Sequence, residues 1–513
     1  MASFNDALVA TDYTHGYARL LNPLMLRFAC LRASVVPPPA PTEDSPWRYL
    51  ELGFGQGLSV NMHAAGIAGQ FWGTDYNPAH AARACDMATA AGAGARLFHA
   101  SFAELLARDD LPQFDAIGLH GIWSWITAAV GADVLAIVAK HLRPGGLVYL
   151  SYNCAPGWTQ TMPLQQLMRI HAETTGGNPI AAMDAAVGYL NTVLAAGVSP
   201  LKADPAVEMR LKQIAGMHRN YLVHEYLAPD FRVLPFADVA QDFASISLQF
   251  AAPAFVIDAI DGINLTADGT ALLATIDNIG LRETTRDFLT HRGFRRDIYV
   301  KGRRALAPLQ QTEALLAERF VLARIADDIS YKTAGPIGEI TLQENLFRPL
   351  IAALAQHNYA AKTAAVLHAD PALAGFSLPM LFEALAVLIG TDQAELAQVP
   401  TAAGRAACKR LNAHLIDLAR TSLDVEYLAS PVTGGGVPVS RIQQLFLLAM
   451  QRGKQDVVLQ AEFVWQILAS QGHRLVVAGQ PLEGDAESIA ELTRNAEEFV
   501  AKRLPILQAM EIM

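Results

Sequence analysis

A short stretch near the start of the chain combines one acidic residue with three glycines. The sequence YLELGFGQGLSV places four residues directly after a run typical of a buried strand: Glu51, Gly53, Gly55 and Gly57. Glycines let a backbone turn sharply and approach a ligand closely, and the amides at the start of the next helix then face that ligand. Glu51 adds a carboxylate beside the loop, which favours a positively charged ligand over a pyrophosphate.

Two cofactors are compatible with such a loop: a dinucleotide, and S-adenosylmethionine with its ammonium and sulfonium groups. A dinucleotide fold places an acidic residue about 20 positions later, on the ribose. Asp75 follows Gly57 by eighteen positions and fits either cofactor. The dinucleotide spacing is GxGxxG, whereas the three glycines here are evenly spaced. The even spacing and Glu51 therefore favour S-adenosylmethionine.

The order of the next segments resembles that of class I methyltransferases. After the loop and Asp75 come HAS at 99–101, then FDAIGLHG, then LRPGG and a strand. The resemblance implies that Glu51 and the loop glycines contact the methionine part of the cofactor and that Asp75 contacts the ribose hydroxyls. It assigns the adenine to Ser101 and Phe102, although the acidic residue that many members have near position 100 is missing.

Polar and aromatic residues follow two further strands, at the sheet edge where ligands of open α/β sheets bind. LHGIWSW at 119–125 and SYNCAPGW at 151–158 supply His120, Trp123, Ser124, Trp125, Tyr152 and Asn153. We expect His120, Tyr152 and Asn153 to align the substrate, with His120 also at the cofactor. Trp123, Ser124 and Trp125 would line the substrate pocket with His224 and Tyr226. Core packing is the alternative for each tryptophan, and a backbone-bonded strand end for His120.

Two other clusters could carry chemistry. His224 and Glu225 have no second histidine at the next helical turn, and the four cysteines lack ligand spacing, so no metal site is predicted. A basic run between 292 and 304 is expected to be a solvated face, with docking of an acidic macromolecule as the alternative.

The composition is typical of a soluble, mildly acidic enzyme. The chain has 513 residues, of which 52% are hydrophobic and 17% charged, and a formal net charge of -10. An acidic surface repels phosphate, which argues against nucleic acid as a partner. No signal-peptide pattern and no run of about 20 apolar residues is present. We therefore expect a cytoplasmic protein without stable membrane insertion.

The order of predicted elements divides the chain into five segments. Residues 1–46 are expected to form an N-terminal helical cap with a proline-rich connector, and 47–159 a Rossmann-like α/β domain that binds S-adenosylmethionine. Residues 160–302 are expected to form a helical insertion and a middle region whose strands complete a seven-stranded sheet. A bridging segment at 303–339 leads to a mostly α C-terminal domain for substrate recognition at 340–513.

Longer motifs resemble bacterial class I methyltransferases that carry a methyltransferase regulatory domain. They are LHGIWSWI, YNCAPGW, HEYLAPDFRVLPFADV, DFLTHRGFRRDIYV and LASPVTGGGVPVSRIQQLFLLA. That family includes protein lysine methyltransferases acting on outer-membrane proteins of intracellular bacteria. The resemblance implies that 217–302 is the regulatory part and that the acceptor is a lysine amine. The loop reads GFGQG here rather than the usual GCGxG.

The leading hypothesis is thus methyl transfer to a protein side chain, the lysine amine. One alternative is a methyltransferase for a small molecule or a cell-surface glycan. Another is a protein that binds S-adenosylmethionine without catalysis and mediates protein contacts. The large helical C-terminal domain favours a macromolecular acceptor, because a small acceptor needs only a lid.

Overall fold

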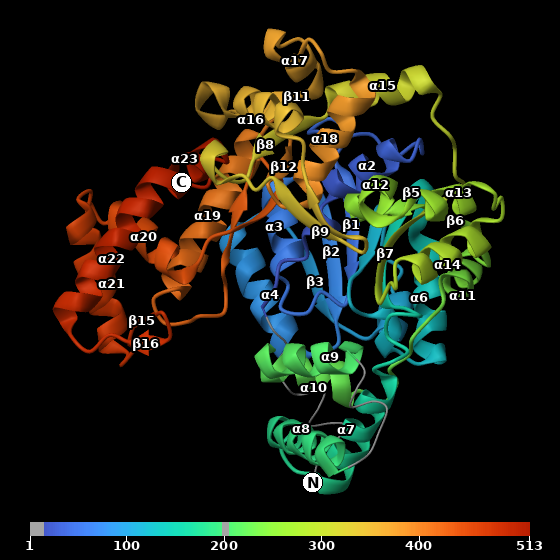
Figure 1. Cartoon of the computed structure of the whole chain (residues 1–513), viewed down its shortest axis with the longest axis horizontal. Helices are drawn as coiled ribbons and strands as arrows, with labels where there is room; N and C mark the ends of the chain where they lie inside the picture. Colours follow the sequence, from blue (N-terminus) through green and yellow to red (C-terminus); the bar gives the residue numbers. More distant parts are fainter. Residues whose placement is uncertain (1–14, 197–204) are drawn as a thin grey trace.

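A sheet of seven strands lies at the centre of the chain (Figure 1). The computed structural model describes residues 15–196 and 205–513. The strand order is β3-β2-β1-β4-β5-β7-β6, and β7 is antiparallel to both of its neighbours. The strands are β1 (Trp47–Leu52), β2 (Gly69–Asp75), β3 (Arg96–His99), β4 (Phe114–Leu119), β5 (Leu142–Asn153), β6 (Leu248–Pro253) and β7 (Phe294–Lys301).

Helices cover both faces of this sheet, which explains why its central strands are apolar on both sides. Every residue of β4 is buried. One face packs against α2 (Pro23–Arg32) and α3 (Leu58–Gly66), and the other against α5 (Phe102–Leu106), α6 (Ala128–His141) and α11 (Phe236–Ala244). The predicted seven-stranded Rossmann-like sheet is confirmed.

The start of α4 (Pro78–Ala91) shows how the sequence sets a helix boundary. The Asn77 side chain accepts hydrogen bonds from the amides of Ala79 and His80, and Pro78 follows in the first turn, where its missing amide costs nothing. The helix ends at Gly92, whose φ of 58° is readily adopted by glycine. These signals fix the position of α4 directly after Asp75.

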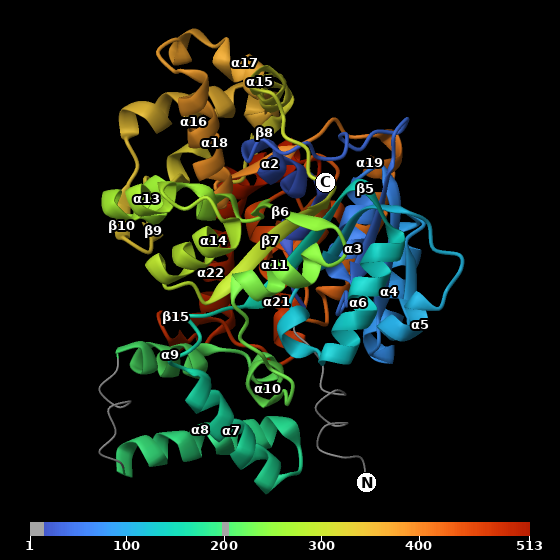
Figure 2. The same cartoon turned by 90° about the vertical axis from the view of Figure 1, so that its right-hand side faces the viewer.

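The helical insertion forms a layer below the sheet in the view of Figure 2. It contains α7 (Met162–Thr175), α8 (Pro179–Ala196), α9 (Pro205–Gly216) and α10 (Arg219–Leu227), which share their own apolar core. Because α7 follows β5 closely, the layer begins at the carboxyl end of that strand. The helix α8 is long and apolar enough to span a membrane, but one third of it is buried against its neighbours.

The segment after β7 is more regular than expected. It contains α15 (Pro308–Ala317), the strand β8 (Arg319–Leu322) and a hairpin of β9 (Lys332–Gly335) and β10 (Gly338–Thr341). Strand β8 is the centre of a three-stranded sheet with β11 (Lys362–Thr363) and β12 (Ala394–Ala397). Since those partners lie beyond residue 340, the expected bridge is part of the C-terminal region.

The C-terminal region is mostly helical and packs against α3 and α4 on one side of the central sheet (Figure 1). Its helices are α16 (Glu344–Tyr359), α17 (Ala364–His368), α18 (Leu378–Gly390), α19 (Ala402–Leu418), α20 (Arg441–Gln451), α21 (Val457–Ser470), α22 (Asp485–Glu498) and α23 (Leu504–Ala509). Gly434 ends the turn of a hairpin, β13 (Tyr427–Ser430) and β14 (Gly435–Pro438), whose second strand begins with the next two glycines and which packs on α3. The short hairpin of β15 (Val476–Val477) and β16 (Gln480–Pro481) precedes α22.

Candidate functional site

The glycine loop joins β1 to α3 and requires glycine at two positions. Gly53 and Gly57 have φ angles of 71° and 75°. A Cβ atom on Gly53 would lie 2.4 Å from Ile122 Cδ1, and one on Gly57 would lie 2.3 Å from Ala84 Cβ. Gly57 precedes α3 without a side-chain cap, so the first amides of that helix are not capped by its own residues.

Asp75 holds the loop in place from the end of β2. Its Oδ2 accepts a hydrogen bond of 2.8 Å from the Gly55 amide, and its Oδ1 accepts one of 2.9 Å from the Asn77 amide. The space beside Gly55 is open, because no atom lies within 4 Å of the place where its Cβ would be. Asp75 therefore lies beside the open space at Gly55, and its contact with a ribose stays a prediction.

Glu51 is buried in β1 between two glycines. Its register partners are Gly73 on β2 and Gly118 on β4, and its own exposed fraction is 3%. Among residues 15–196 and 205–513, nothing hydrogen-bonds its Oε2. Burial, and then the negative charge of Asp75, raise the pKa of Glu51 to about 8.

An orphaned carboxyl group of this kind fits a cationic ligand. Burying it costs free energy unless a partner is present, and a nearby positive charge would favour its ionised form. The sulfonium and ammonium groups of S-adenosylmethionine supply such charges. The uncapped loop amides, the open space at Gly55 and the orphaned Glu51 together fit this cofactor.

The two residues predicted to contact the adenine have different surroundings in the structure. Ser101 caps α5: its hydroxyl accepts from the Glu104 amide and donates to Glu104 Oε2, while its own amide donates to the same oxygen. The Ser101 side chain is thus committed to Glu104 and is not available to an adenine. The Phe102 ring lies beside the glycine loop, since its Cζ would be 4.0 Å from a Cβ on Gly53, and its contact with an adenine stays a prediction.

His120 follows β4 with part of its surface open to solvent, whereas its Nδ1 side is enclosed by contacts with the next strand of the sheet. Its Nδ1 lies 2.9 Å from the Tyr149 hydroxyl and 3.3 Å from Ser151 Oγ. Loss of hydration, and then the positive charge of Arg296, lower the pKa of His120 to about 4. The imidazole is therefore neutral near pH 7, and its Nδ1 contacts the hydroxyl groups of Tyr149 and Ser151.

Two residues expected to align the substrate are fixed in the interior instead. The Tyr152 hydroxyl donates to Asp297 at 2.8 Å, on the face of β5 opposite Tyr149 and Ser151. Tyr152 is therefore not a substrate-aligning residue, because successive side chains of a strand alternate between faces. The backbone amide of Asn153 donates to Ser124 Oγ at 2.8 Å, and the residue is buried.

The expected pocket residues form structural contacts. Trp123 is buried against Phe243, and Ser124 uses its hydroxyl on Asn153, so neither lines an open pocket. His224 and Tyr226 belong to α10, in the separate core of the insertion. The sequence could not show that α10 packs within this core, because the packing of the insertion depends on residues far apart in the chain.

An aromatic row nevertheless links the sheet edge to the insertion. The Trp125 ring lies 4.6 Å from that of Phe231, Phe231 lies 4.9 Å from Trp158, and Trp158 lies 6.1 Å from Tyr226. The Arg210 guanidinium covers Trp158 at 4.1 Å. Trp125 and Tyr226 thus lie at opposite ends of this row, which holds the insertion against the end of β4.

The basic run is a solvated face only in part, because Arg303 and Arg304 are exposed whereas Arg295 is buried. Arg295 is 3% exposed and makes ion pairs with three carboxylates, those of Glu283, Asp287 and Asp297. Arg292 pairs with Asp258 at 2.5 Å. These arginines compensate carboxylates from α14 (Ile279–Leu289) and β7, a pairing that only the folded chain reveals.

Several residues at the site carried no readable signal in the sequence. Tyr149 and Ser151 meet His120 because they share a face of β5, and Ile122 touches the glycine loop. Phe294 lies at 6.5 Å from the His120 ring, on the antiparallel neighbour of β5. Strand alternation could have suggested Tyr149 and Ser151, whereas Phe294 required the pairing of β7 with β5.

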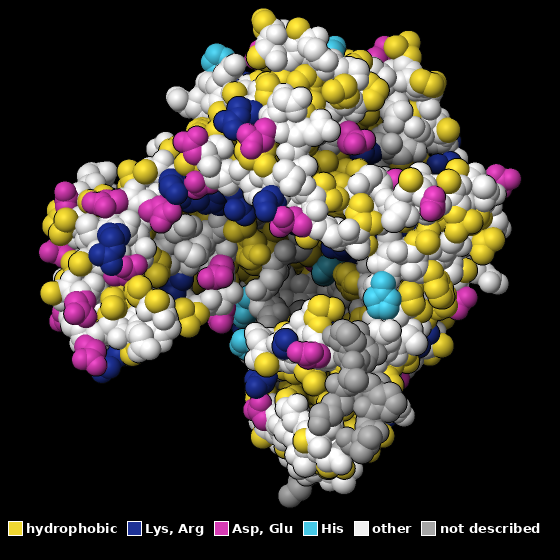
Figure 3. All heavy atoms as spheres, viewed as in Figure 1, with side chains coloured by type: hydrophobic (Ala, Val, Ile, Leu, Met, Phe, Trp, Pro, Cys, Tyr) yellow, Lys and Arg dark blue, Asp and Glu magenta, His cyan; other side chains and the backbone are white. Residues whose placement is uncertain are grey.

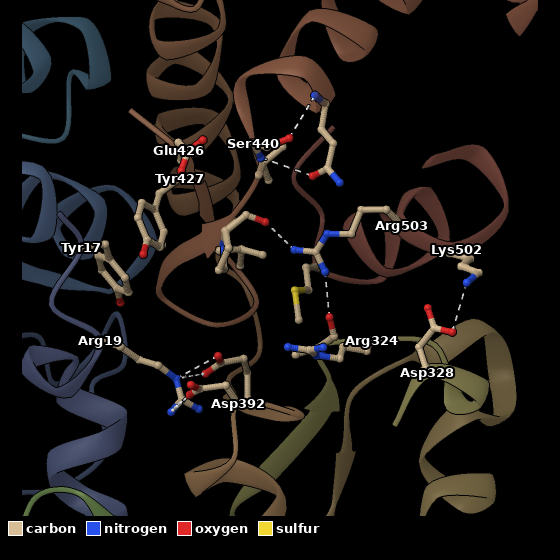
Figure 4. Close-up of a pocket in the computed structure, with 18 of the residues that line it drawn as sticks. Tyr17, Arg19, Arg324, Asp328, Asp392, Glu426, Tyr427, Ser440, Lys502 and Arg503 are labelled. Atoms are coloured by element: carbon tan, nitrogen blue, oxygen red, sulfur yellow. Dashed lines mark hydrogen bonds and ion pairs between the residues drawn. The ribbon is translucent and has the colours of Figure 1, made fainter. Parts of the chain in front are cut away.

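A cavity of about 920 Å³ lies between the N-terminal segment, β8 and the C-terminal region. Figure 3 shows Lys and Arg side chains gathered along a hollow on this side of the molecule. Figure 4 shows the polar lining, with Tyr17 beside Tyr427 of β13 and Arg19 paired with Asp392. Arg296 also lines the cavity, and its guanidinium lies 5.9 Å from the Phe294 ring, which contacts His120. The cavity therefore adjoins the edge of the site at His120.

Two family profiles match the chain. A profile described as "Methyltransferase domain" matches residues 50–146, and one described as "Predicted methyltransferase regulatory domain" matches residues 218–301. The first covers the glycine loop and Asp75. The second runs from the start of α10 to the end of β7, so it includes the two strands that complete the sheet.

Relatives extend the likeness over the whole chain. The uncharacterized protein sll1526 of Synechocystis sp. is 33% identical over 515 residues, which cover 99% of this chain and 100% of that protein. The uncharacterized protein RP789 of Rickettsia prowazekii is 25% identical over 252 residues, or 48% of this chain and 45% of that one. Among solved structures, PKMT2 from Rickettsia typhi in complex with AdoHcy has a TM-score of 0.68 at 17% identity, and covers 95% of this chain and 98% of that chain. The fold is thus shared from the N-terminal segment to the C-terminal helices.

Proposed function

The chain belongs to the class I S-adenosylmethionine-dependent methyltransferases that carry a methyltransferase regulatory domain, and on this premise we propose that its methyl acceptor is a lysine amine of a protein. The proposal is supported by the extent of the structural likeness to PKMT2, which covers 95% of this chain, together with the sequence motifs that resemble protein lysine methyltransferases. The likeness includes the insertion and the C-terminal region, which a small acceptor would not require. A cavity of about 920 Å³ between the N-terminal segment, β8 and the C-terminal region offers room for part of a polypeptide.

The geometry assigns the chain's residues to orientation and charge rather than to covalent chemistry. When bound, S-adenosylmethionine supplies a methyl group on a positively charged sulfur. The loop amides and Asp75 would orient it, and the orphaned carboxyl of Glu51 would balance its positive charge. The neutral His120 adds no positive charge next to a cationic cofactor and a cationic lysine.

The acceptor amine must lose its proton before its lone pair can take the methyl group. A histidine with a pKa of about 4 is too weak a base to remove a proton from an ammonium group near pH 7. We therefore assign His120 to positioning, and the proton of the amine to solvent. A hydroxyl acceptor would instead require a base stronger than His120 at the sheet edge.

Methyl-labelled cofactor tests the proposal directly. The purified protein is incubated with labelled S-adenosylmethionine and a lysate of the native host, one half of which has been chemically acetylated at its amines. We expect label in a protein band from the untreated half, none from the acetylated half, and methyl-lysine in the mass spectrum of that band. Label in a glycan or small-molecule fraction, or label that survives acetylation, would contradict a lysine acceptor.

A further inference from the structure

The charges that line the cavity beside Arg296 are unevenly compensated. Its basic residues are Arg19, Arg296, Arg324, Lys502 and Arg503, and its acidic residues are Asp328, Asp392, Glu395, Glu426 and Glu498. Most of them form pairs: Arg19 with Asp392 and Glu395, and Lys502 with Asp328 and Glu498. Arg296 pairs with Asp258, outside the lining.

Arg324 and Arg503 have no such partner. Within residues 15–196 and 205–513, neither guanidinium forms an ion pair, and they lie next to each other at one wall of the cavity (Figure 4). Arg503 donates at 2.7 Å to the Ala323 carbonyl and also to the Pro438 carbonyl, which fixes its direction. Arg324, on the loop after β8, is exposed to solvent.

Two adjacent positive charges without a carboxylate are costly in a partly dehydrated wall. Loss of hydration, and then the charge of Arg324, lower the pKa of Arg503 to about 10, although Glu395 acts in the opposite direction. An anion placed between the two guanidinium groups would relieve this repulsion. The planar fork of arginine matches a carboxylate or a phosphate with two hydrogen bonds.

The rest of the lining distinguishes between these anions. Glu426 forms no ion pair within residues 15–196 and 205–513, and Asp392 is 68% exposed in its side chain, so a dense polyanion would meet repulsion. A polypeptide with separate acidic side chains can place one carboxylate at the arginines and keep others away. A volume of about 920 Å³ is at the upper end of what a single small ligand fills.

We propose that Arg324 and Arg503 form a carboxylate-binding subsite that holds an acidic side chain of the polypeptide acceptor, close to the residue that is methylated. This inference rests on the proposed function and deepens it, since it assigns an acidic sequence context to the acceptor. Arg296 lies between the cavity and the site. Its guanidinium is 4.2 Å from the centre of the Phe255 ring, which lines the cavity, and 5.9 Å from the centre of the Phe294 ring, which contacts His120.

Two lysine peptides of equal length test the inference, one with Asp and Glu on both sides of the lysine and one with Asn and Gln there. Binding to the full chain is measured by fluorescence anisotropy with S-adenosylhomocysteine present, so that no methyl transfer is needed. We expect the acidic peptide to bind about tenfold more tightly, because a charge-assisted pair contributes that order of affinity. Arg324→Gln should remove this preference, and Arg324→Lys should retain part of it.

The matched control is Arg348→Gln, which removes an exposed arginine of α16 that pairs with Glu344 outside the cavity. This variant should keep the preference, and all three variants should bind the cofactor like the wild type. Arg503 is left unchanged because its two carbonyl bonds join β8 to the C-terminal region.

Each result has a distinct meaning. Equal binding of both peptides by the wild type, or a preference that survives Arg324→Gln, overturns the inference. Displacement of the acidic peptide by millimolar inorganic phosphate at constant ionic strength also overturns it, in favour of a phosphate site. Tight binding of the acidic peptide without methylation of any lysine supports the subsite and contradicts the lysine acceptor. Methylation of both peptides with equal KM supports the lysine acceptor and contradicts the subsite.

Discussion

The substitution Glu51→Gln is expected to stabilise the cofactor-free protein while it weakens cofactor binding. The pKa of Glu51 rises from an ordinary value of 4.5 to about 8 on folding. Between these two values the folded protein holds one proton more than the unfolded chain. Its free energy of unfolding therefore falls by about 1.4 kcal/mol with each pH unit gained, and the loss reaches about 3 kcal/mol at pH 7. Glutamine has a similar shape and no proton to lose, so it escapes this loss.

The assay is chemical unfolding of both proteins from about pH 5 to about pH 8, without cofactor. We expect the variant's advantage to widen with pH and to level off above about pH 8. Calorimetric titration with S-adenosylmethionine should show affinity reduced about tenfold or more, because the positive ligand loses its carboxylate. Glu462→Gln, on the exposed side of α21, is the control and should change neither quantity.

A constant difference between the unfolding free energies of wild type and Glu51→Gln across this range would refute the reasoning. It would mean that Glu51 takes up no extra proton on folding. Unchanged cofactor affinity in the same variant would show that the carboxyl group, although orphaned, does not face the ligand.

Four other substitutions separate binding from stability. Asp75→Ala should abolish measurable cofactor binding in calorimetry, since it removes both the loop's hydrogen bond and the predicted ribose contact; unchanged affinity would sink that assignment. Gly57→Ala should lower the thermal unfolding temperature, because its Cβ would lie 2.3 Å from another methyl group; an unaltered temperature would contradict the tight packing. Tyr152→Phe should cost about 1–3 kcal/mol in urea unfolding and leave KM unchanged, since its hydroxyl bonds to the buried Asp297; a raised KM alone would return Tyr152 to the substrate site. His120→Gln should leave the shape of the rate–pH profile between about pH 6 and about pH 8 unaltered, because a group with a pKa of about 4 does not titrate there; a lost inflection would identify His120 as a base.

The cofactor side of the site could be predicted because its residues are close in sequence. Glu51 and Asp75 lie at the ends of two neighbouring strands and the loop glycines follow the first of them, and a parallel sheet brings the carboxyl ends of such strands together. Backbone requirements also leave a local trace, since a positive φ at Gly57 selects glycine whatever the rest of the chain does.

The acceptor side could be predicted only in outline. Tyr152 and Ser151 are neighbours in sequence, yet they lie on opposite faces of β5, and which face meets His120 depends on the packing of β7 and α11. Likewise, Ser101 is a plausible adenine ligand until its capping of α5 is seen.

By itself the sequence determined the class of fold, the cofactor loop and the order of the segments, because strand alternation, helix caps and glycine turns are set by residues near one another in the chain. The tertiary structure alone decided which charges are compensated. Arg295 is neutralised by carboxylates of α14 and β7, whereas Arg324 and Arg503 come together from positions 179 residues apart without an acidic partner among the described residues. Electrostatic pairing depends on distance in space, and a charged residue carries no local record of the partner that folding will place beside it.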